Sequence, residues 1–173
     1  MRVVHSTIAA IVLVLVASSA FAQKVVTDSD ASANFKAFKT YAWAKGTESP
    51  NPLGEKRIHD GVDAKMKAAG FTLVTEKPDV FVATHAVAKE QKELYTMGMG
   101  GYGPRWGGGS GTTTVNTYLV GTLAVDLYDG KTKQLIWRGT ATDTLDEKPE
   151  KNAEKVAKSL EKMFKEYPPK VKK

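Results

Sequence analysis

Three residues of this 173-residue chain have the side-chain types of a catalytic or ligand-binding cleft: Asp79, His85 and Asp126. A carboxylate within hydrogen-bond reach of an imidazole can serve in general acid–base chemistry or bind a small polar molecule. A simpler local role competes, since Asp79 follows Pro78 where a strand is expected to begin. The sequence leaves open a small-ligand binder or hydrolase that uses a carboxylate and histidine cleft, provided that the three side chains converge.

Other motifs with known chemistry are incomplete. Residues 98–103 match G-x-G-x-x-G, but Pro104 and further glycines follow in place of a helix, so a dinucleotide site is not expected. Ser110 lacks the second glycine of a nucleophile elbow. His59 and His85 are not part of an H-x-x-x-H motif or a Cys/His cluster, the spacings typical of metal ligands. We therefore expect no metal, no cofactor and no enzymatic activity.

A second candidate site is the glycine-rich segment from residue 97 to residue 111. Eight of the fourteen residues from 98 to 111 are glycine, which raises the backbone entropy that ordering would have to overcome. Methionine and aromatic side chains on such a backbone are typical of adaptable partner-binding surfaces. We expect a flexible loop that contacts a partner. The alternative is a disordered insertion that has no function. The expected contact residues of the loop are Met97, Met99, Tyr102 and Trp106.

Residues 1–22 have the pattern of a cleavable secretory signal peptide. Arg2 supplies the positive start, residues 8–16 form an apolar stretch, and an A-x-A cleavage site ends at Ala22. The apolar stretch is shorter than the roughly 20 residues that span a bilayer. The chain has no cysteine, so neither disulfides nor a lipid-bearing cysteine are expected. The predicted location is periplasmic or secreted after cleavage at Ala22, with no lipoprotein anchor and no later transmembrane helix.

The mature chain is modestly basic. Loss of Arg2 with the signal leaves 24 basic and 19 acidic residues, so the formal net charge falls from +6 to +5. The surplus is concentrated in the C-terminal tail, residues 168–173, which either contacts an anionic surface or is simply solvated. Basic and aromatic residues do not interleave as a nucleic-acid stacking platform requires. The expected partner is therefore an unknown envelope protein or a membrane surface, and not nucleic acid.

The most regular part of the chain is the stretch 118–142. Apolar and polar residues alternate on both sides of Asp129-Gly130, which indicates two half-buried antiparallel strands joined by a short turn. Leu123, Val125 and Leu127 share one parity before the turn. We expect this hairpin to form the centre of a sheet.

Two amphipathic helices accompany the hairpin. The first is expected to begin after Asn51-Pro52, an N-cap followed by proline, and to end at Gly70. The second is expected to begin at Pro149 and to end before Pro168. Further strands are expected at residues 24–30, 40–43, 71–75, 79–89 and 112–117.

The order of these elements predicts the fold class. It indicates an α+β domain in which two helices pack on one face of a mostly antiparallel sheet, with a long Gly-rich loop. Irregular structure is expected from Glu90 to Thr112. The chain is expected to consist of a signal peptide, residues 1–22, a single domain, residues 23–167, that contains the flexible loop 97–111, and a basic tail, residues 168–173.

Four short motifs occur in order along the mature chain. They are DSD to KTYAW in residues 28–43, A-G-F and K-P-D in residues 69–79, GTLAVD and KQLIWRG in residues 121–139, and Y-P-P in residues 167–169. Together they resemble the bacterial envelope proteins of the domain-of-unknown-function 4136 family. The resemblance implies an exported domain, commonly a lipoprotein, with no catalytic residues to carry over. This chain departs from that pattern in lacking the lipid-bearing cysteine.

Overall fold

The computed structural model describes residues 23–97 and 112–169. The predicted signal peptide, most of the glycine-rich loop and the last four residues of the tail lie outside the described residues. None of the described helices is long and apolar enough to cross a membrane.

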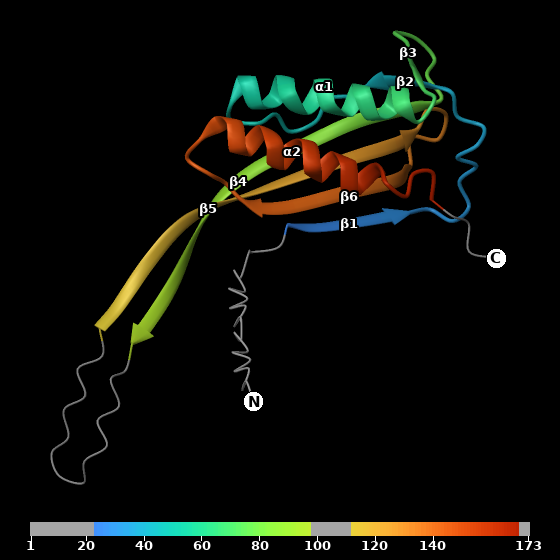
Figure 1. Ribbon diagram of the computed structural model, residues 1–173. Helices are drawn as coiled ribbons and strands as arrows, with labels where there is room; N and C mark the ends of the chain where they lie inside the picture. Colours follow the sequence, from blue (N-terminus) through green and yellow to red (C-terminus); the bar gives the residue numbers. More distant parts are fainter. Residues whose placement is uncertain (1–22, 98–111, 170–173) are drawn as a thin grey trace, which may run out of the picture.

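A six-stranded sheet and two helices make up the described chain (Figure 1). The sheet has the order β1-β6-β5-β4-β2-β3, and only the β2 pairings with β3 and β4 are parallel. This mostly antiparallel arrangement confirms the predicted α+β class. The elements are β1 (Lys24–Ser29), β2 (Thr40–Trp43), α1 (Pro52–Ala68), β3 (Thr72–Leu73), β4 (Val80–Met97), β5 (Thr112–Asp129), β6 (Leu135–Thr144) and α2 (Pro149–Phe164).

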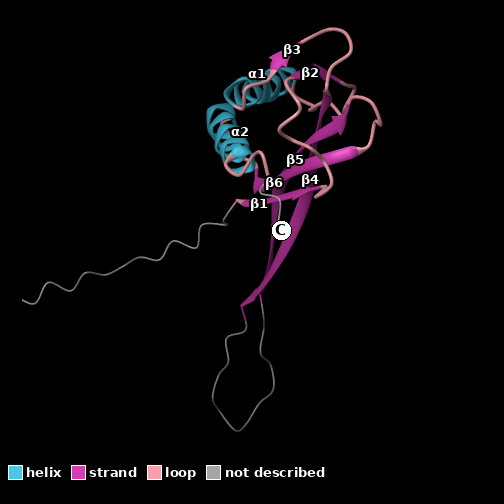
Figure 2. Cartoon of the chain, turned by 90° about the vertical axis from the view of Figure 1, so that its right-hand side faces the viewer, coloured by secondary structure: helices cyan, strands magenta, loops and turns pink. Residues whose placement is uncertain are grey.

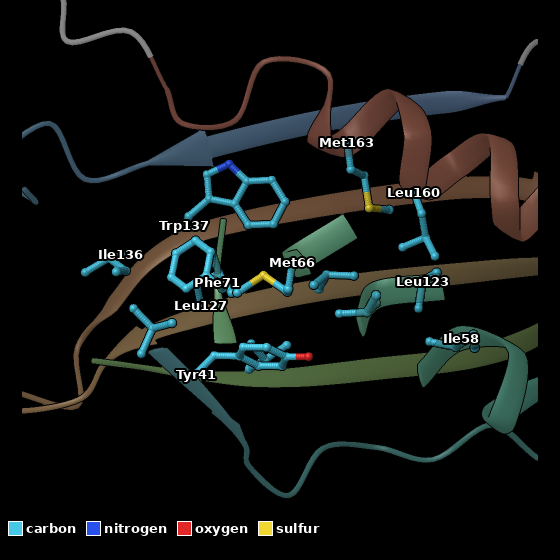
Figure 3. Packing of buried hydrophobic residues seen from close by; sticks show 14 of the residues in the cluster. Tyr41, Ile58, Met66, Phe71, Leu123, Leu127, Ile136, Trp137, Leu160 and Met163 are labelled. Carbon is cyan, nitrogen blue, oxygen red and sulfur yellow. The ribbon is translucent and has the colours of Figure 1, made fainter. Parts of the chain in front are cut away.

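Both helices lie on the same face of the sheet, as predicted (Figure 2). Their apolar stripes and the alternate residues of the central strands enclose one core, because burying these two faces together removes the most apolar surface from water. Figure 3 shows Trp137 of β6 beside Met163 of α2. The side chains with almost no exposed surface include Val62, Met66, Val80, Val82, Val125, Leu127, Leu160 and Met163.

The ends of the helices follow the expected capping chemistry. Asn51 accepts hydrogen bonds from the amides of Leu53 and Gly54, and Pro52 begins α1. Gly70 has a φ of 89°, in the left-handed region that favours glycine after a helix. Pro149 begins α2, whose preceding residue Lys148 makes no side-chain capping bond.

The β5–β6 hairpin lies in the interior of the sheet, between β1 and β4, and β5 is one of the two middle strands. The prediction that the hairpin forms the centre is thus met by β5 and missed by β6, which is second from the edge. The turn of the hairpin is held by Asp129, whose carboxylate accepts hydrogen bonds from the amides of Lys131 and Thr132 at 2.8 and 2.7 Å. Leu123 and Leu127 face the helices, and Asp126 lies on the opposite face because successive strand residues alternate.

The strand predicted at residues 79–89 corresponds to β4, and its predicted end was wrong. Irregular structure was expected from Glu90, but β4 continues to Met97 and pairs with β5 down to Thr112. The charged run after Lys89 does not break the strand, because on a two-stranded extension both faces are solvated. The Tyr118 hydroxyl bonds across the ladder to Glu93 at 3.1 Å.

Candidate functional site

The candidate cleft residues do not all converge. Asp126 and His85 lie on the sheet face opposite the helices, with Asp126 Oδ2 3.5 Å from His85 Nε2. Asp79 precedes β4 and lies about 20 Å along the strand from His85, at about 3.3 Å per residue. The expectation that all three would meet is therefore wrong for Asp79.

Asp126 is the fully buried member of a polar cluster on that face. Arg138 on the neighbouring strand donates to both carboxylate oxygens, from Nε at 2.6 Å and from Nη2 at 2.5 Å. The Tyr128 hydroxyl donates to the same carboxylate at 3.1 Å. Burial, followed by the negative charge of Asp126, raises the pKa of Tyr128, and hydrogen bonding to Asp126 raises that of Arg138.

His85 connects this cluster to the chain that follows β2. Thr47 Oγ1 lies 3.0 Å from His85 Nδ1, so hydroxyl, imidazole and carboxylate follow one another as in a hydrolase relay. The Thr47 amide, which an oxyanion would require, already donates to the Thr84 carbonyl at 2.9 Å. Thr47, His85 and Asp126 line neither the hollow between the helices and the sheet nor the one beside β1 and Trp137. The cluster is therefore better matched to holding strands together than to acyl transfer.

Asp79 ties the start of β4 to the start of β2. Its carboxylate accepts hydrogen bonds from the Lys39 amide at 2.8 Å and from the Thr40 amide and hydroxyl at 2.9 Å. These bonds stabilise the charged form and hold the pKa of Asp79 below its ordinary value. The local role suggested by Pro78 is the one that the structure shows.

Replacing Asp79 by asparagine should give a pH-dependent loss of stability. The folded state lowers this pKa, so the carboxylate stabilises the fold fully above its unfolded pKa of about 3.9 and loses that contribution as pH falls through the folded pKa. We expect Asp79→Asn to cost about 1 kcal/mol in urea unfolding at pH 7. The difference from wild type should shrink below about pH 4.

The exposed Asp60, replaced in the same way, serves as the control for that titration. Its partner is Lys56 on the same helix, and 62% of its side chain is exposed. We expect Asp60→Asn to change stability by less than about 0.5 kcal/mol. An Asp79→Asn penalty that stays constant from pH 7 to pH 3 would contradict the assigned role of the charge.

The expected loop contacts lie almost entirely outside the described residues. Met99, Tyr102 and Trp106 are among these, and only the backbone of Met97 is described, as the last residue of β4 opposite Thr112. The structure therefore places the base of the predicted loop at the end of a long pair of strands.

This pair of strands, residues 90–97 of β4 and 112–119 of β5, is here called the ribbon. It extends beyond both helices (Figures 1 and 2). The last described contact on the outer edge of β4 is the donation of Ala86 N to Thr47 O. On the outer edge of β5, pairing with β6 ends at Val120, and one further hydrogen bond runs from Leu145 N to Leu119 O. Leu94 and Val115 are cross-strand partners on one face, 70% and 52% exposed. Sequence reasoning missed this surface because it treated residue 94 as loop.

Comparison with known protein families assigns the chain to a family. The sequence profile described as "Domain of unknown function (DUF4136)" matches residues 25–169, which covers all eight strands and helices except the first residue of β1. The chain belongs to this family. No curated protein matches the chain.

Solved structures resemble this DUF4136 chain in fold. A PDZ domain protein from Parabacteroides distasonis is 18% identical with a TM-score of 0.56 over 86% of this chain, which spans only 35% of that protein. The PelC dodecamer from Paraburkholderia phytofirmans is 13% identical with a TM-score of 0.46, over 83% of this chain and 98% of that one. Lipoprotein GNA1162 from Neisseria meningitidis is 10% identical with a TM-score of 0.40, over 73% and 99%.

Proposed function

We propose that this DUF4136 protein is a non-enzymatic binding module of the bacterial cell envelope that docks a partner protein on its ribbon. The observation that carries the proposal is the extension of two paired strands beyond the rest of the sheet, with apolar side chains exposed on one face. A two-stranded hairpin is only marginally stable in water. Binding of a partner strand would complete it.

The outer edge of β5 is the surface best suited to that partner. Residues 112–118, TTTVNTY, contain no charge and are rich in threonine, which favours strands. The next residue, Leu119, already accepts a hydrogen bond from Leu145 N at its carbonyl. Natural proteins usually protect edges with charged residues, as β4 does from Lys89 to Glu93. The uncharged edge near Val115 and Asn116 can accept an extended segment by main-chain hydrogen bonds.

The exposed apolar face adds side-chain contacts to the same site. Leu119 shares the parity of Val115 and is 46% exposed, so Leu94, Val115 and Leu119 lie on one face of the ribbon, here called the strip, with the Lys92–Thr117 pair between them. Burying such side chains against a partner removes apolar surface from water and so favours association. The predicted loop contacts Met97, Met99, Tyr102 and Trp106 continue the chain at the end of this strip.

An envelope location is supported by the sequence. The signal pattern in residues 1–22 predicts export. The chain itself has no cysteine that could carry a lipid. We therefore propose a periplasmic or secreted protein that reaches its partner without a lipid anchor.

Replacing Val115 by lysine tests the proposal, because a charge on the strip disfavours both strand addition and apolar contact. Intact cells would be cross-linked, the protein isolated, and the captured proteins compared by mass spectrometry. The matched control is Leu135→Lys, at a leucine of β6 that is 40% exposed and lies outside the ribbon. We expect one captured protein to disappear with Val115→Lys and to remain with Leu135→Lys. Identical captures from both variants would overturn the proposal.

A deletion of residues 98–111 separates the ribbon from the loop. If the loop supplies part of the contact, the same captured protein should be recovered in reduced amount. Its full recovery would assign docking to the ribbon alone and would remove Met99, Tyr102 and Trp106 from the proposed site.

A further inference from the structure

A cavity of about 300 Å³ lies between the helices and the sheet, near the N-terminal ends of both helices. Residues from α1, α2 and the three central strands line it, and most of its surface is apolar. It is separate from the Asp126 cluster, which lies on the other face of the sheet. A volume of this size is at the lower end of the range for small-molecule sites, about 300 to 1,000 Å³.

The hollow exists because small residues face one another across it. Ala86 and Ala141 contribute to its lining from the sheet, and Ala153 does so from α2. Gly121 also lines it, where a Cβ would come within 2.7 Å of Leu145 Cδ2. An apolar cavity of about 150 Å³ binds a benzene-sized molecule. The present cavity therefore has room for an alkyl chain of about ten carbons.

The rim of the cavity carries both signs of charge. Lys155 donates to the Thr144 carbonyl at 2.6 Å and lies 3.9 Å from Asp143, so these two rim charges offset each other. Arg57 of α1 and Glu147, just before α2, also line it, are exposed, and form no ion pair within the described part of the chain. The rim thus offers one available cation and one available carboxylate.

We propose that this cavity binds a single-chain zwitterionic phospholipid. The alkyl chain occupies the space between Ala86, Ala141 and Ala153, the phosphate pairs with Arg57, and the ammonium group pairs with Glu147. An uncharged alkane would leave both rim charges unused, and a fatty acid would use only Arg57. The site does not involve the ribbon edge, so its test and the partner-capture test succeed or fail independently.

Decylphosphocholine, kept below its micelle concentration, is a suitable probe for the purified mature protein in isothermal titration calorimetry. We expect saturable binding of one molecule per chain. Ala153→Phe, which fills the cavity, should weaken binding by about tenfold or more, a loss of about 1.4 kcal/mol. Ala157→Phe is the matched control, because Ala157 is an exposed residue of the same helix that does not line the cavity. It should bind as wild type does.

The headgroup contacts are tested by Arg57→Gln and Glu147→Gln. Each should weaken decylphosphocholine binding several-fold, and neither should alter the binding of decanol. The controls are Lys56→Gln and Glu150→Gln, at exposed neighbours outside the lining. Equal affinity of both rim variants and wild type for decylphosphocholine would overturn the headgroup assignment.

Alanine-methyl NMR of the wild type keeps the proposal falsifiable if Ala153→Phe does not fold. The probe should shift the methyl signals of Ala86, Ala141 and Ala153 and leave that of Ala157 in place. Shifts confined to other alanines, or no saturable binding at all, would overturn the cavity as a lipid site.

Discussion

Replacing Arg138 by alanine is expected to lower the free energy of unfolding by about 3 to 5 kcal/mol. The reason is that Asp126 is fully buried and receives two of its hydrogen bonds from this one guanidinium. Without Arg138 the carboxylate stays in the sheet with only the Tyr128 hydroxyl and His85 nearby. Urea unfolding at pH 7, followed by circular dichroism, measures the change.

The two partners of this ion pair should respond unequally. Arg138 has 46% of its side chain exposed, so after Asp126→Ala it can turn toward water, and the expected cost is about 1 to 2 kcal/mol. Replacing both, with Asp126→Leu and Arg138→Met, should restore stability to within about 1 kcal/mol of wild type. Equal costs for the two single variants would contradict the assigned burial of Asp126.

Replacing Gly46 by alanine is expected to cost about 3 kcal/mol. An added Cβ would overlap the Thr84 carbonyl oxygen, a backbone atom that cannot move without disturbing β4. The shift would also break the hydrogen bonds of 2.9 Å that Thr47 exchanges with Thr84 and Ala86. Urea unfolding gives the loss, and amide hydrogen exchange should increase at Thr47 and Ala86 first.

Gly54→Ala is the matched control for Gly46→Ala. Gly54 lies in the first turn of α1, and the nearest atom to an added Cβ is Ser49 Oγ at 3.4 Å. Alanine in a helix is favoured over glycine by about 0.5 to 1 kcal/mol, so stability should stay the same or rise. A similar loss at both positions would mean that the close approach of residue 46 to β4 has been misassigned.

The sheet centre and both helices could be predicted because their signals are local. Strict alternation around Asp129-Gly130 identifies the hairpin, and Asn51-Pro52 with Gly70 brackets α1. The ribbon could not be predicted in this way. From Glu90 to Thr96 neither face meets the core, so the hydrophobic alternation that marks a strand is absent.

The candidate site depended on information that sequence spacing does not contain. His85 and Asp126 come together because the β4–β5 register places Ala83 opposite Asp126 and His85 opposite Ala124. Asp79 was wrongly grouped with His85 and Asp126. Its bond to Thr40 depends on the parallel pairing of β2 with β4, which sequence spacing does not show. Leu94 is exposed because the ribbon extends past the helices (Figure 1), and no local sequence pattern marks that extension.

Photo-cross-linking at Leu94 tests the central claim, docking on the ribbon, most directly. A photoreactive amino acid would replace Leu94, on the ribbon, or Leu73 of β3, a leucine that is 52% exposed away from the ribbon (Figure 1). After irradiation of intact cells, the account predicts a discrete cross-linked species of higher mass from position 94 and none from position 73. The same species from both positions, or none from position 94, would contradict docking on the ribbon.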